Sequence, residues 1–114
     1  MTNPEWRREL ASLEGLADDW DGEGAPAPNA DSIAWATDVT SWALSLGEIE
    51  IEVSPDVLGG VGVWLVKGGR EASLGRHNDE YFATFVLSDG HQIAGHGRLD
   101  DNGRSDVARF LAEG

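Results

Sequence analysis

The sequence contains no cysteine, so it can form neither a disulfide nor a thiolate metal site. It also lacks a run of about 18 apolar residues, the length that a membrane-spanning helix needs. The stretch from Met1 to Glu5 has neither the basic residues nor the following apolar residues of a secretory signal. We therefore expect a soluble protein of the cytoplasm.

Basic residues are scarce: eight Lys and Arg stand against 21 Asp and Glu, which gives a formal net charge of −13. The charge is uneven, because residues 1–56 contain 13 acidic and two basic residues, whereas residues 57–114 contain eight and six. The acidic half should repel nucleic acid and anionic membranes and attract a basic surface at long range. An acidic surface can also serve only to keep a small protein soluble.

Motifs of catalytic and metal sites are missing too. An EF-hand alignment of the Asp19–Gly22 stretch would place Ala17 and Pro28 where the calcium loop needs its first and last ligands. The chain has three histidines, His77, His91 and His96. Their spacing is neither His-x-His nor His-x-x-x-His, and no serine lies in a nucleophile elbow. The sequence therefore predicts a protein that is not an enzyme and that has no cofactor and no metal site.

The most distinctive stretch that is present is an acidic turn, residues 18–28, which is rich in carboxylates, glycine and proline. Glycine permits backbone angles that other residues avoid, and proline fixes its own φ angle. These residues predict an ordered turn between two helices rather than a helix interior. Its structural residues should be Trp20, Gly22 and Gly24, with the Trp20 ring anchoring the turn to the core.

Apolar residues at spacings of three and four predict a helix on each side of this turn. The first helix should begin at Asn3 and Pro4, which suit a cap and a first turn, and end near Gly15. The second should run from about residue 29 to about residue 46.

Strict alternation over residues 48–53 then predicts a strand with Ile49, Ile51 and Val53 facing the core. Further strands are expected at residues 61–66, 71–76, 81–87 and 92–97, followed by a short helix that Ser105 caps. The expected fold is a single α+β domain over residues 1–114, with two N-terminal helices, an antiparallel meander of about five strands and a short C-terminal helix.

The first strand also carries a row of carboxylates on its other face. Side chains on one face of a strand recur every ~6.6–6.8 Å, which is close to the spacing of successive phosphates in a nucleic-acid strand. We predict that this row and the acidic turn contact a basic partner. The predicted contact residues are Asp18, Asp19, Asp21, Glu23, Glu48, Glu50 and Glu52. The same alternation is also typical of an ordinary strand with one solvated face.

The Trp20–Ala25 motif, followed by prolines, a helix and the Pro55–Val61 stretch, resembles a group of small uncharacterised bacterial and phage proteins that share a Trp-Asp-Gly-x-Gly-Ala turn. The resemblance covers about residues 10–76 and implies a fold pattern without an activity. In size and acidity the chain is also similar to anti-CRISPR proteins and antitoxins, without a shared motif.

These observations favour a small acidic protein that inhibits a basic nucleic-acid-processing protein, such as a CRISPR effector or a toxin nuclease, by mimicking nucleic-acid phosphates. Neither nucleic acid nor a membrane is expected to bind directly, and the oligomeric state stays open. The alternative is a structural or self-assembling module that uses an exposed edge strand or tryptophan patch. A small enzyme would instead need a pocket that combines a histidine with a carboxylate.

Overall fold

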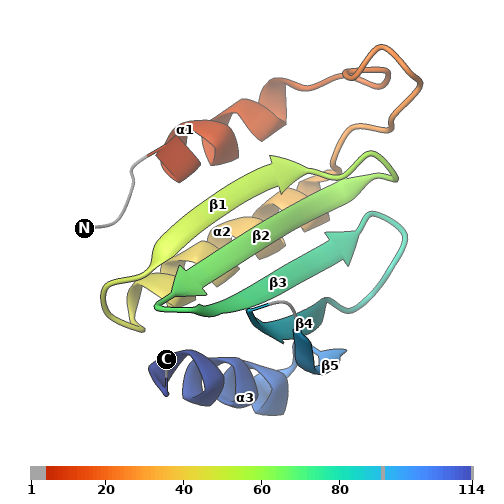
Figure 1. Ribbon diagram of the computed structural model, residues 1–114. Helices are drawn as coiled ribbons and strands as arrows, with labels where there is room; N and C mark the ends of the chain where they lie inside the picture. Colours follow the sequence, from red (N-terminus) through yellow and green to blue (C-terminus); the bar gives the residue numbers. More distant parts are fainter. Residues whose placement is uncertain (1–4, 91, 114) are drawn as a thin grey trace.

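A computed structural model of the chain describes residues 5–90 and 92–113. In this part of the chain, three α-helices and one five-stranded antiparallel sheet form an α+β fold (Figure 1). The helices are α1 (Glu5–Ser12), α2 (Ala30–Leu44) and α3 (Asp101–Ala112), and the 3-10 turn η1 (Leu13–Gly15) continues α1. The strands are β1 (Glu50–Pro55), β2 (Gly60–Lys67), β3 (Arg70–His77), β4 (Thr84–Asp89) and β5 (Gln92–Arg98).

The strands lie in the sheet in chain order, β1-β2-β3-β4-β5, so the predicted antiparallel meander is confirmed. Two strand starts differ from the prediction by more than one residue. The first strand starts at Glu50 rather than Glu48. The fourth starts at Thr84, because Tyr81 and Phe82 lie exposed in the preceding loop, where the Arg98 guanidinium lies 4.0 Å from the centre of the Phe82 ring.

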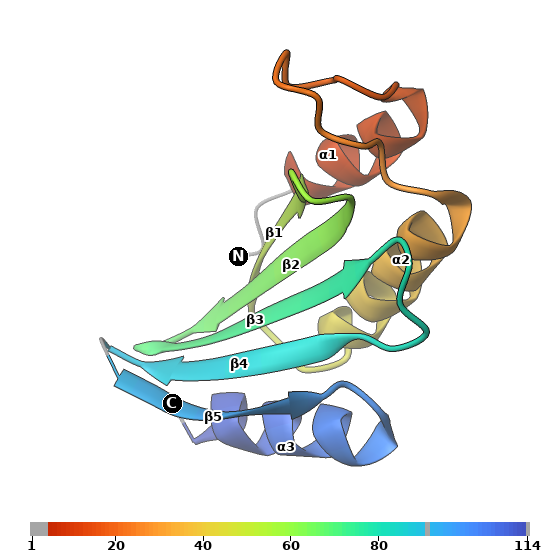
Figure 2. The same cartoon turned by 90° about the vertical axis from the view of Figure 1, so that its right-hand side faces the viewer.

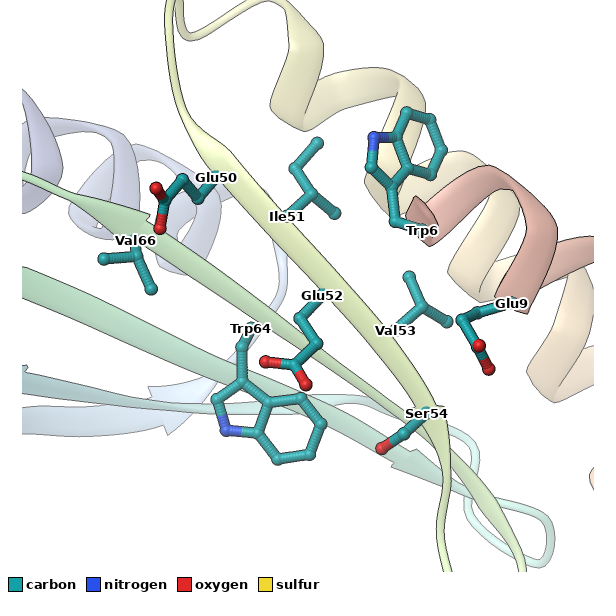
Figure 3. A pocket seen from close by; sticks show the side chains of 9 residues that line it. All are labelled: Trp6, Glu9, Glu50, Ile51, Glu52, Val53, Ser54, Trp64 and Val66. Carbon is teal, nitrogen blue, oxygen red and sulfur yellow. The ribbon is translucent and has the colours of Figure 1, made fainter. Parts of the chain in front are cut away.

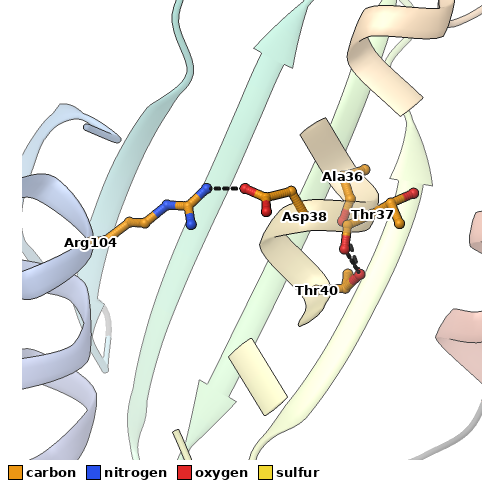
Figure 4. A network of polar contacts seen from close by, with 5 residues as sticks. All are labelled: Ala36, Thr37, Asp38, Thr40 and Arg104. Carbon is orange, nitrogen blue, oxygen red and sulfur yellow. Dashed lines mark hydrogen bonds and ion pairs between the residues drawn. The ribbon is translucent and has the colours of Figure 1, made fainter. Parts of the chain in front are cut away.

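Two helices pack against the same face of the sheet (Figures 1 and 2). Helix α2 contacts β1, β2 and β3, and α3 contacts β2, β3 and β4. The Arg104 guanidinium of α3 and the Asp38 carboxylate of α2 form an ion pair at 2.6 Å that joins the two helices (Figure 4). The first helix, α1, lies beside β1 at the sheet edge and buries Trp6. None of the helices in the described residues is long and apolar enough to span a membrane.

The hydrophobic core lies between the sheet and these helices. The predicted direction of the side chains around the first strand is confirmed: Ile49, Ile51 and Val53 are buried, and the glutamates between them are exposed. The fully buried side chains include Leu13, Val39, Val61, Val63, Leu65, Val107 and Leu111. The hydroxyl of Thr40 is buried among these side chains. It donates to the Ala36 carbonyl oxygen at 2.9 Å (Figure 4), so its burial leaves no unpaired polar atom.

The last helix begins earlier than predicted. We expected Ser105 to cap it, but Ser105 lies inside α3 and the Asp100 side chain is the cap, accepting from the Gly103 N–H at 2.7 Å. The Asn102-Gly103 pair is typical of a turn, yet Gly103 serves here as a helical residue that packs against the backbone at Arg98. The predicted cap residues Asn3 and Pro4 lie outside the described residues.

The opposite face of the sheet is covered by none of the described helices (Figure 2). The strand register arranges its side chains in rows that cross all five strands. The central row is Glu52, Trp64, Ser73, Val86 and His96, and the next row is Glu50, Val66, Glu71, Ser88 and Ile93. We call this surface the open face. It is acidic at β1 and has exposed apolar side chains further along the rows.

Candidate functional site

The acidic turn, residues 18–28, is ordered by its own carboxylates. Three of them accept hydrogen bonds from backbone N–H groups of the turn: Asp18 from Ala27 at 3.0 Å, Asp19 from Gly24 at 2.6 Å, and Asp21 from Glu23 at 2.8 Å and from Ala25 at 3.0 Å. Aspartate side chains commonly hold turns in this way. These three predicted contact residues therefore shape the turn, and each has one carboxylate oxygen engaged in doing so.

The predicted turn residues also lie where the backbone needs them. Gly22 and Gly24 have φ angles of 79° and 87°, in the left-handed region that favours glycine. Trp20 is half-buried, and its indole N–H donates to the Pro26 carbonyl oxygen at 3.0 Å. We expected its ring to pack in the core; instead this hydrogen bond joins the two arms of the turn.

Acid should loosen this turn through Asp21. The N–H groups of Glu23 and Ala25 lower the pKa of Asp21 below its ordinary value, because they stabilise the carboxylate in the folded chain. The unfolded chain then binds the proton more tightly, so this contribution to stability is complete above the ordinary pKa of about 4 and is lost as the pH falls through the lower folded pKa. We expect Asp21→Asn to unfold at lower urea concentration than the wild type at pH 7, with a difference that shrinks towards pH 2. A difference that is the same at both pH values would contradict this role.

Asn78 ties the acidic turn to the sheet. Its Oδ1 atom accepts from the Asn29 N–H at 2.9 Å and from the Ser32 hydroxyl at 3.1 Å, and its Nδ2 group donates to the Ala27 carbonyl oxygen at 2.8 Å. Its backbone N–H donates to the Gly59 carbonyl oxygen at 3.2 Å. The side chain of Asn78 thus connects the turn and the start of α2, and its backbone connects both to the β1–β2 connection.

Replacing Asn78 with aspartate should destabilise the protein by about 2 kcal/mol, because a carboxylate oxygen would face the Ala27 carbonyl oxygen in place of a donor. Urea unfolding followed by circular dichroism measures the change. Asn102→Asp is the matched control: it makes the same chemical change at an exposed position in the first turn of α3, where a negative charge is tolerated. Equal stability of the two variants would contradict the role of Asn78.

The strand carboxylates lie apart from the acidic turn. Glu50 and Glu52 project from β1 on the open face, and Glu48 lies just before the strand. Glu50 begins β1, whereas the turn lies beyond the other end of that strand, between α1 and α2 (Figure 1). The predicted contact residues therefore form two groups, one on the turn and one along β1.

A groove of about 550 Å³ runs along β1 (Figure 3). Its polar wall includes the carboxylates of Glu9, Glu50 and Glu52, and the indoles of Trp6 and Trp64 line it as well. No lining residue is basic. In Figure 3 the strand separates two sets of side chains, with Trp64 and the β1 glutamates on one side and Trp6 and Glu9 on the other.

Sequence reasoning missed Glu9 and Trp64 as members of this site. Glu9 follows Trp6 by three residues, so the helical spacing places both on one side of α1. Trp64 is the direct cross-strand neighbour of Glu52. The helical period thus indicates that Trp6 and Glu9 are neighbours, and the strand period indicates which side chains share a face of the sheet. Neither period shows that α1 packs beside β1.

The histidines do not form a site in the described residues. His77 is half-buried at the end of β3 and His96 is exposed on β5, while His91 lies outside the described residues. Across residues 5–90 and 92–113, no group of three or more His, Asp and Glu side chains is arranged to hold a metal ion.

We compared the chain with protein-family models, with curated proteins and with solved structures, and found no match in any of the three comparisons. The resemblance of the Trp20–Ala25 motif to small bacterial and phage proteins therefore stays a prediction.

Proposed function

We propose that this chain is a small acidic binding protein that inhibits a basic nucleic-acid-processing protein, such as a CRISPR effector or a toxin nuclease. The observation that carries the proposal is the groove along β1, which three carboxylates and two tryptophans line without any basic residue. A cleft lined by charge of one sign focuses the electric field and attracts the opposite charge. Its chemistry fits Lys and Arg side chains of a protein.

Most carboxylates of the described residues are also free to act on a partner. Only three ion pairs occur in this part of the chain, and they engage Asp38, Asp106 and Glu113. The other carboxylates of this part of the chain form no ion pair, so the surface should speed association with a basic protein and make that association dependent on salt.

Inhibition would follow from mimicry of phosphates. Glu50 and Glu52 lie on one face of an extended strand, so their carboxylates repeat at ~6.6–6.8 Å, and Glu9 adds a third charge across the groove. Basic side chains that bind a nucleic-acid backbone could engage these carboxylates instead. Binding, not catalysis, is the role that we propose for them.

Affinity capture from cells that contain this protein tests the proposal. With the chain as bait, we expect one basic nucleic-acid-binding protein at low salt and its loss at high salt, because exposed charges are screened. Recovery that does not change with salt would contradict the electrostatic proposal. Recovery of the chain alone, with a mass that rises with concentration, would instead support self-assembly, for which the exposed Val86 and Ile93 of the open face offer a surface.

A further inference from the structure

The groove follows the outer edge of β1, which α1 flanks on the side of Ile51 and Val53 (Figure 3). β1 is the first strand in the sheet order, so in the described residues it pairs with β2 on one side only. Residues from both faces of β1 line the groove, Ile51 and Val53 from the core face and Glu50 and Glu52 from the open face. The backbone edge of β1 therefore lies between the two walls (Figure 3).

We propose that the basic partner contributes an extended segment that pairs with this edge of β1 as a sixth strand and places an arginine on Trp64. The inference rests on the proposed function, since it assumes that the groove takes a basic protein. An edge strand presents unpaired N–H and C=O groups, and an added strand gains affinity from main-chain hydrogen bonds and specificity from alternate side chains.

Trp64 supplies the specificity on the open face. Its side chain is 36% exposed, and Glu52 is its direct cross-strand neighbour, so a cation over the ring can also reach that carboxylate. The fold already uses such stacking: the guanidinium of Arg98 lies 4.0 Å from the Phe82 ring centre. None of the described arginines stacks on Trp64 in this way.

The strand also limits the length of the segment. Pro55 ends β1 and has no N–H, so the edge that can donate hydrogen bonds covers residues 50–54. Alternate side chains of a paired segment would point to the two walls, one set towards Glu50, Glu52 and Trp64 and the other towards Glu9. The preferred segment is therefore about five residues long, with Arg or Lys at alternate positions.

The test uses the full chain and the peptide acetyl-Arg-Thr-Arg-Thr-Arg-amide, with binding followed by NMR at low salt. Two further peptides have the same sequence and charge but carry methyl groups on backbone nitrogens. One is methylated at its two threonines and the other at its three arginines. Because successive N–H groups of a strand point to opposite sides, we expect one methylated peptide to bind at least about tenfold more weakly and the other to bind like the parent. The shifted amides should be those of β1 together with the Trp64 indole.

Equal binding of all three peptides would overturn the added strand, and so would shifts confined to the β5 edge. Trp64→Leu keeps an apolar side chain and should bind the parent peptide at least about fivefold more weakly; unchanged affinity would overturn the arginine on Trp64. The peptides also separate this inference from the proposed function. Suppose that all three peptides bind the wild-type chain equally. If the Glu50→Lys/Glu52→Lys variant then binds none of them, only the strand pairing fails; if this variant binds them as tightly as the wild type does, the proposed function fails as well.

Discussion

Replacing Gly103 with alanine is expected to lower the free energy of unfolding by about 3 kcal/mol or more, although alanine is favoured over glycine in a helix interior by about 1 kcal/mol. A Cβ atom at this position would lie 2.0 Å from the Arg98 carbonyl oxygen and 3.0 Å from the Phe85 ring. The carbonyl belongs to the backbone at the end of β5, so it cannot move without shifting the strand or α3. The variant should therefore disturb the packing of α3 on the sheet.

Thermal and urea unfolding of the wild type and of Gly103→Ala measure this change, and we expect the melting temperature to fall by about 10 °C or more. Gly15→Ala is the matched control, because Gly15 ends the 3-10 turn η1 and a Cβ atom there would meet no atom within 4 Å. Its stability should stay within about 0.5 kcal/mol of the wild type. Equal stability of the two variants would contradict the close approach of the Arg98 carbonyl oxygen to Gly103.

The double reversal Glu50→Lys/Glu52→Lys should weaken binding of the captured partner about 100-fold at low salt. Each reversal replaces an attraction in the groove with a repulsion against a basic surface, and about 1.4 kcal/mol for each charge gives this factor. Both side chains are exposed on an edge strand, where lysine is well tolerated, so the fold should be unchanged. Surface plasmon resonance over a series of salt concentrations should also show a weaker dependence of affinity on salt.

The control variant for this experiment is Asp79→Lys/Asp89→Lys, which changes the net charge by the same amount. Both residues are exposed and neither lines the groove along β1. We expect the control to retain affinity within about threefold, since a distant surface charge acts mainly through the screened long-range field. An equal loss in both double variants would mean that net charge, and not the groove, governs binding.

The fold was largely predictable because its elements have clear periods. The change from a period near 3.6 to a period of 2 after Gly47 predicted both α2 and β1, and the glycines at 68 and 69 predicted the β2–β3 hairpin. Boundaries were less predictable where tertiary contacts decide them. Phe82 has a strong strand preference, yet it lies in a loop where Arg98 covers its ring.

Only some residues of the candidate site were predictable, since Glu9 and Trp64 were missed, and its geometry was not predictable. Glu50 and Glu52 are exposed on one face of β1, as the alternation requires. The carboxylates of the turn look the same in sequence, but Asp18, Asp19 and Asp21 accept hydrogen bonds from backbone N–H groups that only the folded turn brings into reach. The groove itself depends on how α1 packs beside β1, which no local pattern of the sequence encodes.

The most direct test of the central claim is a competition between this chain and nucleic acid for the captured partner. A fluorescently labelled oligonucleotide bound to the partner would be titrated with the wild-type chain, and its anisotropy measured. We predict that the wild type displaces the oligonucleotide at a one-to-one ratio, and that Glu50→Lys/Glu52→Lys does not displace it at the same concentration. Formation of a larger complex that retains the oligonucleotide would contradict the proposal that the β1 carboxylates occupy a phosphate-binding surface.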